Sequence, residues 1–325
     1  MSMPATDRMF DFLTGAEADY MHVVIGKLGE TTWAKPLIAD IETSGGLKSK
    51  NMAKLFELRF GNALDGAGVK PRYEVPGEGG SKIDFGFTSG GTEFLVEMMR
   101  LEETEAVRKA TTLKEFEDGA VMAQRHLHSD AEDARQTPEG ETLKAVQRIC
   151  QKLEKDGKPH KLPLPAGAMH VLLVDFRAFK NGGDKADRAH IALGGKFVPH
   201  PFRHYFGGKL ITGVFDPETD QKGAPQARER LHFVGFVHEK SYEDGSFGPS
   251  IQFIANPNMF KTAEEAQAAL AGWPLGKPEI LNAPVKTTPE KLTKLADAMS
   301  SMTVAEGAEL SKMLKAKFGL AGTSS

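Results

Sequence analysis

The segment from Ser81 to Arg100, SKIDFGFTSGGTEFLVEMMR, constrains the fold of this chain more than any other. Two runs with strand-like alternation, Lys82 to Phe87 and Glu93 to Met99, flank the glycine-containing connection Thr88-Ser89-Gly90-Gly91. Residues in an extended strand point alternately to opposite faces, and a short connection with glycine joins antiparallel neighbours. The segment therefore predicts a β-hairpin inside a larger sheet.

Helix and strand patterns surround this hairpin. Apolar residues recur at three- and four-residue intervals over 50–65, which predicts a helix, and a second helix is predicted over about 140–155. The remaining predicted strands are 169–176, 210–215, 231–238 and 250–255, and the remaining predicted helices are pieces of 1–48, the charged stretch 102–128, and 262–271. This order predicts an α/β domain over residues 1–275, with a mixed central sheet flanked by helices and a helical N-terminal extension.

Composition limits where the chain acts and what it binds. The 325 residues carry a formal net charge of -3, so any site for a polyanion such as nucleic acid has to be local. The single cysteine, Cys150, excludes an intrachain disulfide and fits a reducing compartment. The start of the chain lacks a signal-peptide pattern, and the apolar run 169–176 is too short to span a bilayer. A cytoplasmic protein that does not bind membranes is expected.

The hairpin also carries the most informative polar residues. Asp84 lies in its first strand and Glu97 in its second, where a suitable register brings the two carboxylates together. Such a pair can bind Mg²⁺, which prefers oxygen ligands and can activate a water molecule next to a phosphate. Glu57 interrupts the apolar pattern of the preceding helix and supplies a third carboxylate.

These residues resemble the PD-(D/E)XK nuclease superfamily over about residues 50–176. Asp84 matches the strand aspartate of that superfamily, Glu97 its second acid, and Glu57 the helix glutamate of many members; the helix with Gln147 and the strand 169–176 match the helix and strand that come after its core motif. The resemblance implies a restriction-endonuclease-like fold, with a mixed four-stranded sheet between helices. It also implies a metal-dependent nuclease that acts on nucleic acid phosphodiesters, with Mg²⁺ bound by Asp84 and Glu97 and Glu57 assisting.

The chain departs from the motif at its lysine. The family places that lysine two residues after the glutamate, where this chain has Met99. Methionine has no cation to orient a water molecule or stabilise developing negative charge. Lys82 or Lys152 is expected to substitute. The alternative is a non-catalytic interaction or scaffold protein that retains the nuclease-like fold, in which Asp84 is a polar residue at a strand end and Glu97 is neutralised by an arginine such as Arg59 or Arg100.

Two further polar patterns have less specific meanings. The predicted helix around Gln147 and the segment after it are basic, which is typical of a solvated face but also of a surface that contacts phosphates. The residues concerned are Lys144, Arg148, Lys152, Lys155, Lys158 and Lys161. His232 and His238 lie on an alternating strand and are predicted to be surface or sheet-packing residues.

The C-terminus predicts a separate helical hairpin over 288–325, after a proline-containing linker at 276–287. Thr288-Pro289-Glu290 begins its first helix, and Thr303 with Glu306 forms a capping box that begins its second. The segment 290–320 is similar to the N-terminal dimerisation region of the bacterial ribosomal stalk protein, but the chain lacks that protein's hinge and second domain. Two helices of this size cannot bury both apolar stripes alone, so we expect a homodimer through this hairpin unless it packs on the large domain.

Overall fold

A computed structural model describes residues 13–102, 104–116, 121–125, 134–155, 158–159, 161–179, 185–198, 205–206 and 208–281, together with Thr303, Glu306 and Glu309. The chain divides into two units, Met1–Pro284 and Val285–Ser325. The division falls within the predicted linker.

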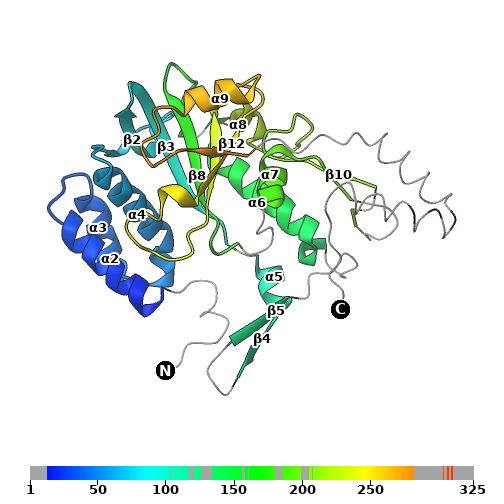
Figure 1. The fold of residues 1–325 in the computed structure, drawn as a ribbon, viewed down its shortest axis with the longest axis horizontal. Helices are drawn as coiled ribbons and strands as arrows, with labels where there is room; N and C mark the ends of the chain where they lie inside the picture. Colours follow the sequence, from blue (N-terminus) through cyan, green and yellow to red (C-terminus); the bar gives the residue numbers. More distant parts are fainter. Residues whose placement is uncertain are drawn as a thin grey trace. The chain divides into compact units, whose positions relative to one another are not determined.

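The first unit is built on a mixed seven-stranded sheet (Figure 1). In spatial order its strands are β1 (Arg72–Pro76), β2 (Lys82–Ser89), β3 (Thr92–Arg100), β8 (Met169–Asp175), β11 (Phe233–Val237), β12 (Ile251–Ala255) and β13 (Glu279–Ile280). The first three strands are antiparallel, whereas β3, β8 and β11 run parallel. An antiparallel β12 and a parallel β13 complete the sheet, so the first residues of the predicted linker belong to it.

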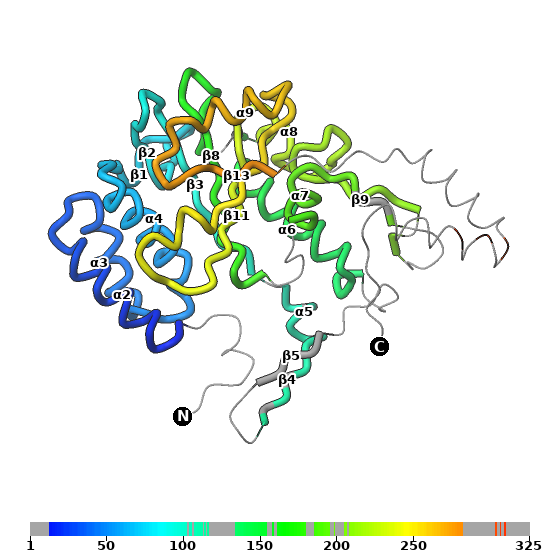
Figure 2. The backbone as a smooth tube through the Cα atoms, in the orientation of Figure 1, coloured from blue at the N-terminus to red at the C-terminus, as the bar shows by residue number. Residues whose placement is uncertain are grey.

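Helices cover both faces of the sheet. On one face α4 (Met52–Gly66) and α9 (Ala263–Ala269) pack on the strands, and α2 (Gly15–Leu28) and α3 (Lys35–Thr43) form a further layer on α4 (Figure 2). On the other face lie α6 (Pro138–Leu153), α7 (Lys185–Leu193) and α8 (Ala224–Arg230). The α4-side core is rich in phenylalanine, with Phe56, Phe60, Phe85, Phe87 and Phe94 all buried.

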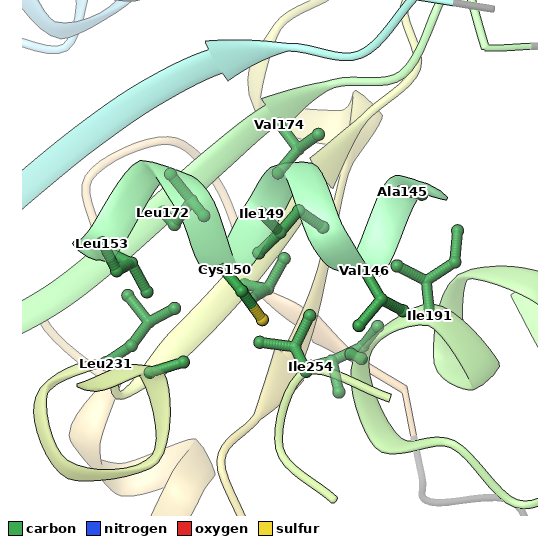
Figure 3. Packing of buried hydrophobic residues seen from close by; sticks show 14 of the residues in the cluster. Ala145, Val146, Ile149, Cys150, Leu153, Leu172, Val174, Ile191, Leu231 and Ile254 are labelled. Atoms are coloured by element: carbon green, nitrogen blue, oxygen red, sulfur yellow. The ribbon is translucent and has the colours of Figure 1, made fainter. Parts of the chain in front are cut away.

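Helix α6 illustrates why these residues form this layer. Thr137 caps its first turn by accepting a hydrogen bond from the backbone N–H of Gly140 at 3.0 Å, and Pro138 takes the first helical position. Its buried apolar residues recur at helical spacing and belong to the core cluster with Leu172 and Val174 of β8 and Ile191 of α7 (Figure 3); they are Ala145, Val146, Ile149, Cys150 and Leu153. Each large apolar side chain buried here contributes about 1.5–3 kcal/mol. Burial raises the pKa of Cys150 to about 12, so this thiol is a core residue, not a nucleophile.

The remaining elements described are small. They are α5 (Glu105–Lys109), the hairpin β4 (Thr111–Glu115) with β5 (Val121–Arg125), the pair β6 (Glu154–Lys155) with β7 (Lys158–Pro159), the pair β9 (Lys196–Phe197) with β10 (Leu210–Ile211), and 3₁₀ turns at Ser49–Asn51, Ala134–Gln136 and Gly248–Ser250. No helix within the described residues is both long and apolar enough to cross a membrane.

The predicted α/β class with a mixed sheet is confirmed, and so are the hairpin, the helices at 50–65 and 140–155, and three of the four later strands. The helix predicted over 102–128 is wrong, because among the described residues of that stretch only α5 is helical and the strands β4 and β5 pair antiparallel after it. Of the strand predicted over 210–215, only the two residues of β10, Leu210–Ile211, are extended and paired in the structure. Strand β1 was not predicted, because Pro71 and Pro76 at its ends are typical of a loop.

Of the C-terminal unit the structure describes only Thr303, Glu306 and Glu309. The Thr303 and Glu306 side chains exchange hydrogen bonds with each other's backbone N–H at 3.4 and 2.8 Å, which confirms the predicted capping box. Glu306 and Glu309 are helical. The rest of the predicted hairpin lies outside the described residues.

A buried histidine pair lies where β8 begins and just before β11. His170 and His232 are both almost fully buried, and the backbone N–H of His170 donates to Nδ1 of His232 at 3.0 Å. Burial lowers the pKa of His232 to about 4, and burial also lowers the pKa of His170. His232 is therefore a packing residue of the sheet, whereas His238 is exposed.

This pair should make the fold sensitive to acid. Below about pH 6.5, the ordinary pKa of histidine, the unfolded chain takes up protons that the folded chain refuses. The free energy of unfolding therefore falls progressively as the pH is lowered from neutral towards 4, by about 2–3 kcal/mol for His232. Urea unfolding at several pH values measures this loss. In His232→Asn, whose amide oxygen can still accept from His170, the loss should be smaller, and in His22→Gln, which changes an exposed histidine, it should be unchanged.

Candidate functional site

The candidate site lies where β2 and β3 separate. Their pairing runs from Ser89↔Thr92 to Phe85↔Val96 and stops, while Lys82 and Ile83 continue to pair with β1. Asp84 stands at the point of separation. Its Oδ2 accepts a hydrogen bond from the backbone N–H of Met98 at 2.7 Å, in place of a ladder hydrogen bond between the strands. This hydrogen bond from its side chain holds Asp84 beside β3.

Glu97 projects from β3 on the α6 side of the sheet, together with the half-buried Leu95 and Met99. Its side chain is fully buried, and its Oε1 receives two ammonium groups: Lys152 of α6 at 2.8 Å, and Lys161 from the segment before β8. Lys161 also lies 3.7 Å from Oδ1 of Asp84. The other oxygen of Glu97, Oε2, is buried and has no hydrogen-bond partner among the described residues.

Glu57 reaches the same group of charges from α4. Its carboxylate accepts a hydrogen bond from the hydroxyl of Tyr73 on β1 at 2.8 Å. Burial, followed by the negative charge of Asp84, raises the pKa of Glu57 to about 8. Three carboxylates from α4, β2 and β3 therefore lie within electrostatic range of one another.

The lysines only partly offset this concentration of negative charge. Burial and the charge of Asp84 raise the pKa of Glu97 to about 7, although Lys152 and Lys161 act to lower it. Burial acts to lower the pKa of Lys152, but the charges of Glu97 and Asp84 outweigh it and the pKa is raised. The site thus holds two cations firmly and retains carboxylate groups that would gain from a further cation.

The backbone holds Lys161 in an unusual conformation. Its φ is 69°, in the left-handed region that non-glycine residues occupy at a cost of about 1 kcal/mol or more. The turn between β1 and β2 stabilises this conformation, because the backbone N–H of Glu78 donates to the Lys161 carbonyl at 2.8 Å. Gly77 in that turn has to be glycine, since a Cβ there would stand 2.6 Å from the same carbonyl. In this backbone conformation the Lys161 ammonium contacts Oε1 of Glu97.

The structure brings together four of the five residues predicted from sequence: Glu57, Asp84, Glu97 and Lys152. The fifth, Lys82, instead forms an exposed ion pair with Glu74. Neither arginine considered as a partner of Glu97 contacts it: Arg59 pairs with Glu239, and Arg100 lies near Asp175 and Glu102.

Sequence reasoning did not identify Lys161 or Tyr73 as site residues. Tyr73 was missed with its strand, β1. Lys161 was noted only as part of a basic segment, because it belongs to an irregular stretch where no periodicity indicates the direction of a side chain.

A magnesium ion fits part of this arrangement. No group of three or more His, Cys, Asp or Glu side chains in the described part of the chain is arranged to hold a metal. Mg²⁺, however, is often bound through only one or two carboxylates, with water completing its shell. The unpartnered Oε2 of Glu97 and the Oδ1 of Asp84 are the oxygens that remain for it.

No family model, curated protein or solved structure matches this chain. The geometry and chemistry of the site are therefore the basis for assigning a function.

Proposed function

We propose that this protein is a metal-dependent nuclease of the PD-(D/E)XK type that cleaves phosphodiester bonds in nucleic acid. The observation that carries the proposal is the convergence of Glu57, Asp84 and Glu97 with two lysines, at a strand separation that leaves a buried carboxylate oxygen of Glu97 unsatisfied. Apart from the small elements between β3 and β8, the chain order is α4, β1, β2, β3, α6, β8; this antiparallel meander followed by a parallel strand supports the same proposal.

Each side chain has a distinct role in this proposal. Asp84 and Glu97 would hold Mg²⁺, and the bound ion would polarise a phosphoryl oxygen and make a water molecule more acidic. Glu57, hydrogen-bonded to Tyr73, accepts a proton near that water molecule. Lys161 supplies the positive charge that Met99 cannot, next to the carboxylates where negative charge develops.

A basic stripe on α6 supports nucleic acid as the substrate. Lys144, Arg148 and Lys152 are spaced by four residues and therefore lie on one face of the helix. Arg148 donates to the backbone carbonyl of Glu102 at 3.0 Å, which places its cation near the end of β3, and Lys144 donates to Gln147 on the same helix at 2.7 Å. Side chains of this kind can neutralise backbone phosphates on either side of a scissile bond.

A scaffold protein without catalytic activity is the second candidate, and one observation favours it. Lys152 and Lys161 already neutralise one oxygen of Glu97, so an ammonium group occupies part of the space around the carboxylates. Such a cluster can be a structural ion-pair network. The two candidates differ in whether a divalent cation binds.

Binding of Mg²⁺ or Mn²⁺ tests the proposal directly. At about 100 times its Kd, a cation that binds only the folded chain should raise stability by about 2.7 kcal/mol. Asp84→Asn, which keeps an oxygen for the Met98 N–H, should abolish this gain, whereas Glu93→Gln on the same hairpin should not. The titration is best run above the raised pKa values of Glu57 and Glu97, about 8 and about 7, because protons compete with the metal below them.

A cleavage assay on DNA and RNA, with and without a chelator, completes the test. Cleavage that needs the cation and is lost in Asp84→Asn supports the nuclease. If the protein neither binds the cation nor cleaves nucleic acid, the nuclease proposal is wrong and the charged cluster is a structural ion-pair network of a scaffold protein.

We also propose that the C-terminal unit mediates homodimerisation. The capping box at Thr303 and Glu306 supports a helix there, and the apolar stripe that the sequence predicts for this helix would need a partner surface. Light scattering should give a dimer for the intact chain and a monomer for a version that ends at Lys286. A monomer in both cases contradicts the proposal, and a dimer in both places the interface on the first unit.

A further inference from the structure

A pocket of about 590 Å³ lies beside the candidate site, formed by the connection between α2 and α3 and by the residues leading into β1. We name it the Trp33 pocket; its lining includes Thr32, Trp33, Lys70, Arg72, Tyr73 and Glu74. Its size lies within the range of pockets that bind small molecules, about 300–1,000 Å³. The proposed roles of the carboxylates do not account for it.

Two of the residues that line the pocket are aromatic. Trp33 and Tyr73 both contact Phe85 of β2, with ring centroids 5.8 and 5.3 Å away. The six-membered ring of Trp33 lies so close to α4 at Gly61 that a Cβ there would collide with it. Both rings are therefore held in fixed positions by the core, and both line the pocket.

Trp33 is only partly buried, so part of its side chain remains open to a ligand in the pocket, whereas its Nε1 is buried and has no hydrogen-bond partner among the described residues.

Cations stand at the same pocket. Arg72 is exposed and paired with Glu93, and Lys70 is exposed and forms no ion pair within the described residues. A flat apolar platform bordered by a free ammonium group is the combination by which proteins bind single-stranded nucleic acid: the base stacks, and the cation neutralises a phosphate.

The pocket is linked to the carboxylates through a single side chain. Tyr73 lines the pocket, and its hydroxyl donates to Glu57 at 2.8 Å. The next residue, Glu74, also lines the pocket and has a φ of 54°, a second strained position at this site. A nucleotide in the pocket would therefore lie next to the group that we assign to the reaction.

We infer that the Trp33 pocket binds an unpaired nucleobase of single-stranded nucleic acid, stacked on an aromatic ring. The inference rests on the proposed nuclease function and narrows its substrate to strands with unpaired nucleotides. Bases within a duplex cannot use this pocket, because their faces are covered by their neighbours and their pairing edges by the partner strand.

Binding of labelled oligothymidylate and oligouridylate to the intact chain, with a chelator present, tests the inference without catalysis. Fluorescence anisotropy should show binding that Trp33→Ala weakens by about 5- to 100-fold, the range for one stacked base. Lys70→Gln should reduce the slope of log K against log salt by about 0.7, whereas Lys35→Gln on α3 should not. Comparison of the two oligonucleotides distinguishes DNA from RNA as the source of the base.

Intrinsic fluorescence adds a test that does not depend on a truncated side chain. The chain has two tryptophans, and Trp273 is only 5% exposed in the α4-side core. Oligonucleotide should quench the wild-type emission. In Trp33→Phe, which keeps an aromatic ring for packing, the quenching should disappear while binding persists.

The outcomes separate this inference from the nuclease proposal. Binding and quenching without cation-dependent cleavage would support the pocket and overturn the nuclease. Cleavage by a Trp33→Ala protein that unfolds normally and binds single strands as tightly as the wild type would overturn the pocket and leave the nuclease intact. Duplex DNA that binds as tightly as a single strand and quenches the emission equally would also overturn it.

Discussion

Replacing Lys161 by methionine should reduce cation-dependent cleavage by about 100- to 1,000-fold, the usual cost of removing one group that stabilises developing charge. Lys161 contacts Oε1 of Glu97 and lies 3.7 Å from Oδ1 of Asp84, so its charge acts where the phosphate would react. Its strained backbone indicates that the fold stabilises this position at some cost. Methionine keeps most of the side chain's length and apolar surface, and Lys152 still pairs with Oε1 of Glu97 in the variant, so the loss should appear in kcat with little change in stability.

The native Met99 provides the sharpest control. It projects from β3 on the same side as Glu97, where a lysine could reach the same carboxylates. If Lys161 replaces the lysine that this strand lacks, then Met99→Lys should restore much of the activity lost in Lys161→Met. Lys82→Met removes a lysine that pairs with Glu74 and should leave cleavage unchanged. Full activity in Lys161→Met, or no rescue by Met99→Lys in a protein that still binds the cation, would contradict this role.

The contrast between Lys161 and the carboxylates shows what sequence can predict about such a site. Asp84 and Glu97 belong to strands of a predicted hairpin, where the alternation of faces indicates which side chains can meet. Glu57 interrupts a regular apolar stripe, so its position on the helix is also defined. Lys161 lies in irregular chain, and its direction depends on a hydrogen bond to Glu78, far away in sequence. No local pattern carries that information.

The same reasoning applies to the fold. Helices with regular apolar spacing and strands that are buried on both faces were predictable, because burial itself creates the pattern. The stretch 102–128 was misread because its charged residues suit a helix, although Thr111 and Thr112 begin a strand. Their β-branched side chains favour extended structure, and pairing with β5 decides the outcome. Pairing between segments is a tertiary effect that local composition describes poorly.

Replacing Glu239 by alanine should lower the free energy of unfolding by about 3–5 kcal/mol, the range for breaking a buried ion pair from one side. Glu239 and Arg59 are 4% and 3% exposed; Oε2 of Glu239 accepts a hydrogen bond from Nε of Arg59 at 3.0 Å and forms an ion pair with Nη2 at 3.0 Å. Burial raises the pKa of Glu239, and the guanidinium of Arg59 opposes that rise. Without Glu239 the guanidinium would remain buried, stabilised by the rings of Tyr242 and Phe56, 3.6 and 5.8 Å away, and by the charge of Asp175.

Urea unfolding of three variants separates the cost of an unpaired charge from the value of the pair. The double variant Arg59→Met/Glu239→Leu removes both charges while keeping apolar volume, and should recover most of the stability that Glu239→Ala loses. Glu30→Ala breaks an exposed pair with Lys35 and should cost less than about 1 kcal/mol. If the double variant is as unstable as Glu239→Ala, then the lost free energy of unfolding comes from the ion pair itself, which links α4 to the segment after β11. A loss of less than about 1 kcal/mol in Glu239→Ala would instead mean that water reaches Arg59 in the folded protein.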